Sequence, residues 1–327
     1  EYLLSLEEAG VDALLISDFG VWSIARQVVP DMALHVSTQA NTCNWAAVEA
    51  WKNLGAERVV LARELSIAEI IEIDKKCDVE LEVFVHGAMC ISYSGRCYLS
   101  SYLTGRDGNR GECAQVCRWN YQLVEENRPD QAFPIEEDER GTYIMNSKDL
   151  CLLDLIPELA EAGVDSLKIE GRMKSVHYVA TVVSVYRKAI DAWYSNPEQF
   201  AVKSEWKDEL EKVSHRPYFY GFAVNRPDEN GQIYTTSSYV QTRDFVGIVT
   251  GYDKETNTAY IEQRNKMVVG EKLEVLMPDG TLLDIVLNEM RDENGNLFDV
   301  ANRVQQRFSI QSAINLQPYS LLRRISK

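Results

Sequence analysis

The first part of the chain repeats one hydrophobic pattern, in which a short apolar run precedes an amphipathic stretch. The apolar runs are nearly continuous, as is typical of parallel strands covered on both faces. Such runs occur at residues 11–18, 33–39, 57–63, 80–87, 142–149 and 165–171. The stretches between them, such as residues 44–53 and 67–75, have helical spacing. This alternation predicts an α/β fold with a parallel sheet.

Polar residues follow nearly every predicted strand, and this favours a TIM-barrel-like arrangement. A barrel gathers such strand ends at one face, where barrel enzymes carry their active sites. A closed barrel needs eight strands, however, whereas the sequence shows six apolar runs. The chain also opens on a helical stretch, residues 3–10, without a strand before it. We therefore expect a TIM-barrel-like parallel βα domain over residues 1–195 whose N-terminal strands are absent from this sequence.

The pattern changes towards the end of the chain, where short runs are separated by Asp-Gly, Asn-Gly and similar turns. Runs of this kind predict antiparallel strands. They lie at residues 246–253, 258–263, 271–280, 281–290 and 308–314. We expect a small antiparallel β-barrel domain over residues 240–327. Residues 196–239, which include an aromatic-rich run, would connect it to the first domain.

Charge and hydropathy restrict the classes of partner. The 327 residues carry a net charge of −16, which argues against a surface that coats nucleic acid broadly. The acids gather partly in residues 125–140, whereas residues 168–188 hold five cations and one acid, a local site for an anion. The sequence contains no apolar run of 18 residues, so we expect no membrane span. The acidic first residues do not resemble a signal peptide, which favours a cytoplasmic location.

Four of the seven cysteines form the spacing Cys90-x6-Cys97-x15-Cys113-x3-Cys117 in a glycine-rich segment. Soft thiolates select zinc, cuprous copper or iron–sulfur clusters. Only the last pair has the close spacing of structural zinc sites, whereas iron–sulfur clusters tolerate wider spacing. The spacing favours an iron–sulfur cluster over zinc, and four buried free cysteines are the structural alternative. We expect a cysteine-rich insert over residues 88–141.

Four polar residues at strand ends are candidates for catalysis. His86 precedes the first cysteine, where it would act as a proton donor or simply as a hydrogen-bonded loop residue. Lys168, Glu170 and Arg172 alternate along one strand end, so their side chains point the same way. Near a barrel mouth this set suits the binding of a carboxylate or a phosphate. Strand-end salt bridges are the structural alternative.

A second group of residues is suited to binding a substrate. Arg118 and Trp119 adjoin the cysteine motif and Lys174 follows the cationic strand end, as expected for groups that contact splayed RNA bases and phosphates. Arg63 would clamp a carboxylate in a bidentate manner. Gln39 would recognise a small molecule or a base through neutral hydrogen bonds.

The residues around the first cysteines resemble a family signature. The pattern Glu82-x-Phe84-x2-Gly87-Ala88-Met89-Cys90-x4-Gly95-x-Cys97-x-Leu99-Ser100 resembles that of the peptidase U32 family at every specified position. The sequence around Cys113 and Cys117, with the NSKDL motif (146–150) and the KIEGRMKS motif (168–175), resembles the branch implicated in tRNA hydroxylation.

This resemblance implies a function and a cofactor. Members of the branch form 5-hydroxyuridine at the wobble position of tRNA in a route that depends on prephenate, a dicarboxylate. The resemblance implies an oxygen-sensitive 4Fe–4S cluster on Cys90, Cys97, Cys113 and Cys117, with Cys151 as a reserve ligand. It also implies a barrel-like domain that begins upstream of residue 1. The expected partners are the anticodon loop of tRNA and prephenate, with a protein partner or a second copy of the chain as a further possibility.

Two other classes of function stay open from the sequence. A collagenase-like peptidase, as the family name suggests, needs a nucleophile and a base. The chain has four histidines, none with an obvious Ser or Cys partner by spacing, and no HExxH motif. The other alternative is a noncatalytic scaffold for RNA or protein, in which the cluster only fixes a loop.

Overall fold

The structure is a computed structural model that describes residues 1–90, 92–119, 122–124, 132–134, 146–227, 231–233 and 239–326. The chain divides into two compact units that interleave along the sequence. The N-terminal unit consists of Glu1–Met173 and Arg216–Ser238, and the C-terminal unit of Lys174–His215 and Tyr239–Lys327. The helices of residues 174–215 thus belong with the C-terminal strands, whereas the sequence pattern grouped residues 1–195 together.

A parallel sheet forms the centre of the N-terminal unit, as the sequence predicts. Its strands are β1 (Ala13–Ile16), β2 (Ala33–Val36), β3 (Arg58–Val60), β4 (Glu80–Ala88) and β9 (Ser166–Ile169). Strands β1 to β4 pair in order and β9 also pairs with β4, all in parallel. Leu34, Val59 and Leu81 on successive strands are fully buried, as expected of a sheet covered on both faces.

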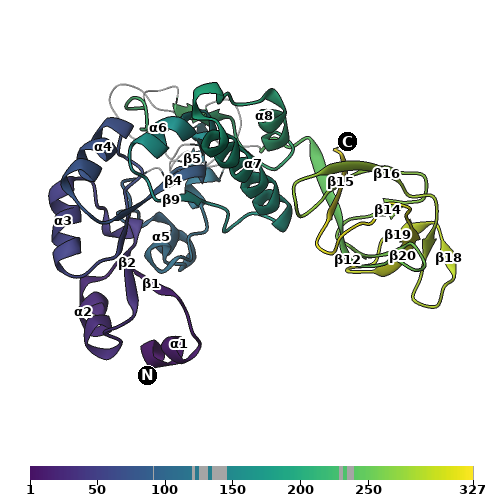
Figure 1. The fold of residues 1–327 in the computed structure, drawn as a ribbon, viewed down its shortest axis with the longest axis horizontal. Helices are drawn as coiled ribbons and strands as arrows, with labels where there is room; N and C mark the ends of the chain where they lie inside the picture. The colour runs from purple at the N-terminus through teal and green to yellow at the C-terminus, as the bar shows by residue number, and fades with distance from the viewer. Residues whose placement is uncertain are drawn as a thin grey trace. The chain divides into compact units, whose positions relative to one another are not determined.

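Helices alternate with these strands, and several of them begin at side-chain caps. They are α1 (Tyr2–Glu8), α2 (Phe19–Val28), α3 (Trp45–Asn53), α4 (Ile67–Lys76), α5 (Leu99–Thr104) and α6 (Ile156–Glu161), with short 3-10 turns η1 (Thr38–Ala40), η2 (Gly108–Arg110), η3 (Val116–Arg118) and η4 (Leu153–Leu155). Ser66 and Glu69 form a reciprocal capping box at the start of α4, and Ile70 and Ile73 bury one face of that helix. Figure 1 shows α2, α3 and α4 along the outer side of the strands.

The fifth predicted strand departs from the parallel pattern. In the part of the run at 142–149 that the structure describes, β7 (Asn146–Ser147) pairs with β11 (Gln232–Ile233). Next, β8 (Asp149–Cys151) runs antiparallel to β4 and parallel to β10 (Tyr218–Phe219). The described part of this run, residues 146–149, is therefore not a further parallel βα strand, because β8 returns beside β4 in the opposite direction. Cys151, the reserve ligand, lies in this strand.

The parallel α/β class is confirmed, but closure of the sheet is not. Among the described residues the strand order is β1-β2-β3-β4-β8-β10, with β9 on β4, and no pairing joins the two ends. A closed TIM barrel is therefore not confirmed. The segment after β4 includes α5, η2, η3 and the pair β5 (Gln122–Val124) and β6 (Ala132–Pro134). Most of the predicted acidic run at 125–140 lies outside the described residues, and the cysteine-rich insert is likewise not confirmed.

The C-terminal unit combines helices with a separate antiparallel β domain, and that domain is as predicted. Its helices are α7 (Val176–Ser195), η5 (Pro197–Gln199) and α8 (Ser204–Leu210). Its strands are β12 (Arg243–Asp253), β13 (Thr258–Gln263), β14 (Met267–Val268), β15 (Lys272–Leu276), β16 (Leu282–Val286), β17 (Met290–Arg291), β18 (Leu297–Phe298), β19 (Val300–Ala301), β20 (Arg307–Gln311) and β21 (Leu321–Ile325). The strands pair in the order β16-β15-β21-β12-β13-β20-β17-β18. No pairing between the two end strands closes this sheet into a barrel among the described residues.

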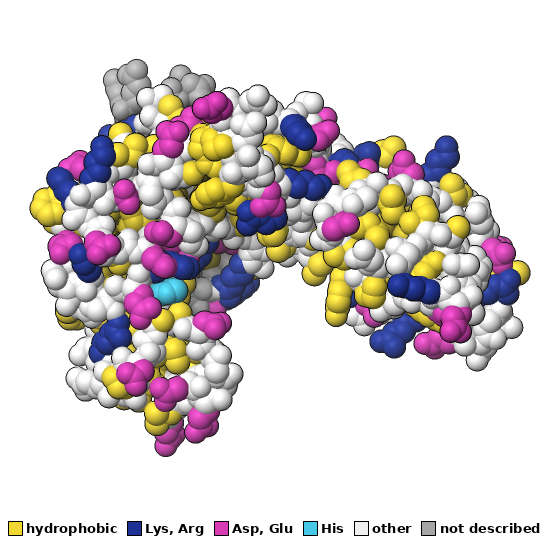
Figure 2. All heavy atoms as spheres, in the orientation of Figure 1, with side chains coloured by type: hydrophobic (Ala, Val, Ile, Leu, Met, Phe, Trp, Pro, Cys, Tyr) yellow, Lys and Arg dark blue, Asp and Glu magenta, His cyan; other side chains and the backbone are white. Residues whose placement is uncertain are grey.

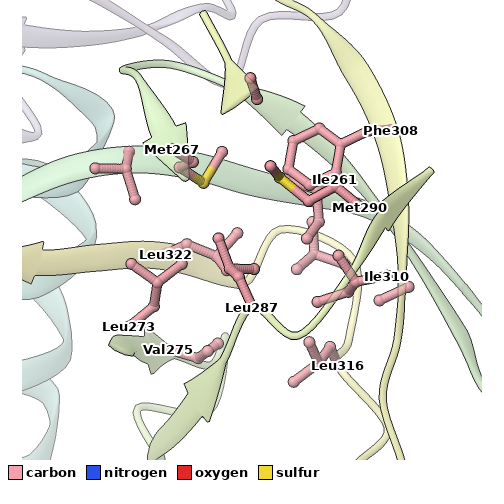
Figure 3. Packing of buried hydrophobic residues seen from close by; sticks show 14 of the residues in the cluster. Ile261, Met267, Leu273, Val275, Leu287, Met290, Phe308, Ile310, Leu316 and Leu322 are labelled. Atoms are coloured by element: carbon pink, nitrogen blue, oxygen red, sulfur yellow. The ribbon is translucent and has the colours of Figure 1, made fainter. Parts of the chain in front are cut away.

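Apolar side chains from both ends of this sheet meet in one core. Figure 3 shows Ile261, Leu322 and Phe308 pointing into the same interior, and each is at most 3% exposed. Lys188 on α7 donates a hydrogen bond of 2.6 Å to the carbonyl of Gly280. This contact helps to explain why α7 belongs to the C-terminal unit. Within the described part of the chain, no helix has the length and apolar character needed to span a bilayer.

Candidate cofactor and substrate site

The four cysteines of the motif line one cavity in the N-terminal unit. Cys90 follows β4, Cys97 precedes α5, and Cys113 and Cys117 lie before and within η3. The cavity measures ≈ 160 Å³, and its wall also includes residues of the strand ends. The structure therefore brings together the four cysteines that the sequence grouped as ligands.

The cysteine thiols are donors of the type that soft metals prefer. Arg63 Nη1 lies 3.1 Å from Cys90 Sγ, and the backbone N–H of Gln115 donates to Cys113 Sγ over 3.3 Å. Burial raises the pKa of the Cys117 thiol to about 11, so without a metal this thiol stays protonated at neutral pH. In the described part of the chain, no three Cys, His, Asp or Glu side chains are placed closely enough to hold a metal ion as they stand.

A buried ion pair holds the last cysteine turn beside the first one. Arg118 Nη1 lies 2.6 Å from Asp149 Oδ1, and the two side chains are 3% and 0% exposed. Arg118 also donates to the carbonyl of Met89, the residue before Cys90. The second carboxylate oxygen of Asp149 accepts from the backbone N–H of Arg216. Arg118, predicted to bind substrate, lines the cavity but directs its guanidinium into this ion pair.

Sequence reasoning did not single out Asp149. The available signal was the NSKDL motif, in which Asp149 is the single acidic residue. A buried carboxylate normally requires a cationic partner, but its partner Arg118 lies 31 residues earlier. The motif therefore indicated that Asp149 is important, but it did not indicate that Asp149 contacts Arg118.

A second cavity of ≈ 520 Å³ lies at the strand ends and collects the other predicted polar residues. Lys168, Glu170 and Arg172 all line it, as the alternation along one strand end predicts. Lys168 Nζ lies 2.6 Å from Glu82 Oε1. Burial by itself would raise the pKa of Glu82, but Lys168, Ser166 and Arg58 together outweigh burial and lower the pKa below its usual value. The charge of Lys168 is therefore largely compensated.

Arg63 and Arg172, two further cations of this cavity, differ in their partners. Arg63 stacks its guanidinium 3.8 Å from the centre of the Phe84 ring and lies 3.7 Å from the Glu170 carboxylate. Arg172 forms no ion pair with any acidic side chain among the described residues. Arg63, Glu170, Arg172 and Gln39 line both cavities, so the two cavities share a wall. Gln39 Nε2 lies 3.5 Å from the Gly108 carbonyl in this wall.

Three other predicted residues lie outside the linings of the two cavities. His86 is fully buried, and its ring centre lies 5.1 Å from that of Tyr218. Cys151 lies opposite His86 in the antiparallel register of β8 and β4. Trp119 is 50% exposed at the end of a described segment.

The cationic stretch at 168–188 is divided between the two units. Lys174 belongs to the C-terminal unit, where its Nζ donates to the Ser214 carbonyl over 2.7 Å and lies 4.1 Å from the centre of the Tyr239 ring. Arg187 forms an exposed ion pair with Asp191. Cations that are close in sequence thus belong to two different units. On the face in Figure 2, acidic and basic side chains among the coloured residues are interspersed rather than gathered in one broad basic area.

The geometry of a Ser–His or Cys–His nucleophile is not found at these cavities. None of the four histidines lines either cavity in the described part of the chain. His177 and His215 belong to the C-terminal unit, and His35 lies in β2. The peptidase alternative therefore gains no support from the described residues.

Comparison with known proteins identifies the class. Residues 1–233 match the model of peptidase family U32, and residues 241–323 match the model of the peptidase family U32 C-terminal domain. The chain therefore belongs to peptidase family U32, in the branch whose members are named tRNA hydroxylation proteins.

Three relatives illustrate this branch and its neighbours. The chain is 42% identical to tRNA hydroxylation protein P1 of Bacillus subtilis, over 99% of this chain and 76% of the relative. It is 38% identical to tRNA hydroxylation protein P of Escherichia coli, over 90% of this chain and 73% of the relative. It is 34% identical to the 23S rRNA 5-hydroxycytidine C2501 synthase of Escherichia coli, over 65% of this chain and 32% of that protein.

Proposed function

We propose that this protein is an iron–sulfur enzyme that forms 5-hydroxyuridine at the wobble position of tRNA in a prephenate-dependent route. The single observation that carries the proposal is the wall shared by the two cavities, which joins four thiols to a cationic strand-end pocket. The names of the relatives, which are tRNA hydroxylation proteins and a 23S rRNA 5-hydroxycytidine synthase, support the reaction class. An RNA substrate and reduced thiols both favour the cytoplasm as the place of the reaction.

The proposed cofactor is a 4Fe–4S cluster on Cys90, Cys97, Cys113 and Cys117. Such a cluster takes about four thiolates and supplies one-electron redox chemistry when bound. Arg63 beside Cys90 and the N–H of Gln115 beside Cys113 would stabilise negative charge on the sulfurs. Cys151, which does not line this cavity, is not needed for a set of four.

The proposed site for prephenate is the strand-end cavity. Its volume of ≈ 520 Å³ lies within the range of about 300–1,000 Å³ that is typical of small-molecule sites. Arg172 forms no ion pair among the described residues, so it is the cation best suited to a substrate carboxylate. Arg63 is suited to the second carboxylate, because Glu170 is 3.7 Å away and competes with it only weakly.

The proposed macromolecular substrate is the anticodon loop of tRNA. Bases of single-stranded loops are splayed and stack on aromatic or Arg side chains, so a wobble base can enter a pocket without opening a duplex. The interspersed charges on the surface agree with a small targeted contact rather than a broad electrostatic one.

The deciding experiment measures nucleosides in tRNA from a strain that lacks the gene. Mass spectrometry should show loss of wobble 5-hydroxyuridine, and the intact gene should restore it. The Cys90→Ser variant should not restore it and should lose its iron and acid-labile sulfide after anaerobic purification. Cys151→Ser is the matched control and should retain both. Unchanged 5-hydroxyuridine in the deletion strain, in the absence of a second copy of the gene, would refute the proposal.

A further inference from the structure

Three tyrosines beside the cysteine cavity are unusually exposed. Tyr93, Tyr98 and Tyr102 are 59%, 70% and 75% exposed, although a tyrosine side chain is mostly apolar. Together with the exposed cations Arg96, Arg106 and Arg110 we call them the tyrosine surface. The rings of Tyr98 and Tyr102 line neither cavity, and grouped exposed apolar surface marks an interaction site.

The short helix α5 holds two of these tyrosines in place. Tyr98 precedes its first residue and Tyr102 follows one turn later, so both lie on one face. Their ring centres are 6.3 Å apart with an angle of 40° between the ring planes. Ser100 between them is buried and accepts a hydrogen bond of 2.9 Å from the backbone N–H of Ala114. The helix is thus fixed through one side and displays the two rings on the other.

The tyrosine surface is continuous with the cysteine cavity. Tyr93 lines that cavity, and Cys97, which also lines it, directly precedes Tyr98. A molecule that presents its reactive group to the cluster proposed for this cavity therefore has its neighbouring groups close to these rings. This continuity indicates that the tyrosine surface binds a part of the substrate that is adjacent to the reacting group.

The charges around the rings favour a polyanion. Arg96, Arg106 and Arg110 are exposed, and Arg110 lies 3.7 Å from the carboxylate of Asp107. Flat aromatic rings among cations, in a chain whose net charge is −16, are the pairing that single-stranded nucleic acids use. Unpaired bases stack on the rings, and the phosphates between the bases meet the guanidinium groups.

We propose that the tyrosine surface stacks the unpaired RNA bases that flank the base presented to the proposed cluster. Tyr98 and Tyr102 form the stacking platform, and Arg106 and Arg110 contact the phosphates. This inference rests on the proposed function, since it assigns the binding of the RNA loop to named residues of the same site. It adds a stacking platform whose two rings line neither cavity.

The test measures binding of an anticodon stem-loop to the anaerobically purified protein by fluorescence anisotropy. Tyr98→Ala and Tyr102→Ala should each weaken binding by about 5- to 150-fold, as expected for loss of one stacked base. Tyr98→Phe and Tyr102→Phe should bind as the wild type does, because the ring remains. Tyr194→Ala is the matched control, since Tyr194 is 73% exposed but lies in the C-terminal unit. Circular dichroism and iron content should be unchanged in all these variants.

The salt dependence tests the cations separately. Arg106→Gln and Arg110→Gln should each reduce the slope of log affinity against log salt by about 0.7, the value for one phosphate contact in a single strand. Equal binding by the wild type and both alanine variants would overturn the inference, and so would binding of a protein partner without RNA at this surface. Loss of 5-hydroxyuridine in the deletion strain tests the proposed function independently of these binding constants.

Discussion

Arg118 and Asp149 form an ion pair of 2.6 Å in which both side chains are almost completely buried. The pair joins the turn that carries Cys117 to strand β8, and Arg118 also contacts the carbonyl just before Cys90. Two of the four proposed ligands are therefore positioned through one carboxylate that does not itself line the cavity. Removing either charge leaves the other buried without compensation, which is costly.

Asp149→Asn should therefore destabilise the protein and loosen the cysteine site. Loss of one partner of a buried ion pair costs about 3–5 kcal/mol in free energy of unfolding. We expect a fall of this size in urea unfolding and a lower iron content. The control is Asp191→Asn, which breaks an exposed pair with Arg187 and should cost less than about 1 kcal/mol. Equal stability and iron content of the two variants would contradict a positioning role for Asp149.

Gly95 lies where the cysteine segment approaches the loop after β2. Its φ is +75°, and an added Cβ would overlap the carbonyl oxygen of Gln39. Gly95→Ala should therefore displace Cys97 and reduce iron binding. Gly105 has a similar φ of +70° with no atom near an added Cβ. Gly105→Ala should thus cost only about 1–2 kcal/mol of backbone strain. The comparison of iron content separates the clash from the strain, and equal losses would show that the contact with Gln39 is unimportant.

Arg172 should dominate the binding of a carboxylate in the strand-end cavity. A hydrogen bond to a charged group contributes about 1.5–3 kcal/mol, so Arg172→Gln should weaken prephenate binding by about 10- to 150-fold. The measurement is isothermal titration calorimetry with prephenate. Lys168→Gln should weaken it less, because Glu82 compensates the Lys168 charge. The reverse order of the two effects would place the carboxylate at Lys168 instead.

The C-terminal unit should lose stability as the pH falls from about 6.5 to 4. Burial and, to a smaller extent, the neighbouring Arg323 lower the pKa of His177 from 6.5 to about 4, although Glu274 opposes this shift. Between these pH values the unfolded chain binds a proton that the folded chain does not. Folding is therefore weakened there by up to about 3 kcal/mol, and the loss is complete below pH 4.

Calorimetric melting of the full chain at several pH values tests this expectation. The Tm of the wild type minus that of His177→Gln should fall between pH 6.5 and 4 and should be constant above pH 7. Glu274 also has a lowered pKa, which destabilises the fold at still lower pH in both proteins and so cancels in the difference. A difference that does not change with pH would show that His177 titrates normally in the folded protein.

The sequence predicted the parts of this fold that depend on local pattern. Continuous apolar runs identified the parallel strands β1, β2, β3, β4 and β9, because burial on both faces leaves few polar positions. Turn residues and short runs likewise identified the antiparallel C-terminal domain. The cysteine spacing grouped the four side chains that line one cavity, since all four lie in one short segment.

Relationships between distant segments were not predictable in this way. An apolar run does not specify the direction of its partner, so β8 was expected to be parallel and is antiparallel to β4. The central strand β21 escaped prediction because Arg323 interrupts its apolar pattern. Arg323 is nevertheless fully buried, since Glu209 and Glu274 from other elements accept its hydrogen bonds. From the sequence alone, a charged residue is predicted to be exposed unless its partners are known.

The sequence by itself determined the α/β class, the antiparallel C-terminal domain, the family and the four candidate thiols. Only the tertiary structure decided that Arg118 faces Asp149 and that Lys168 is compensated by Glu82. Only the tertiary structure also placed Lys174 in a different unit from Arg172. The physical reason is the same in each case: spacing along the chain determines which residues are available, whereas the charge and exposure of each one depend on side chains that folding brings from elsewhere.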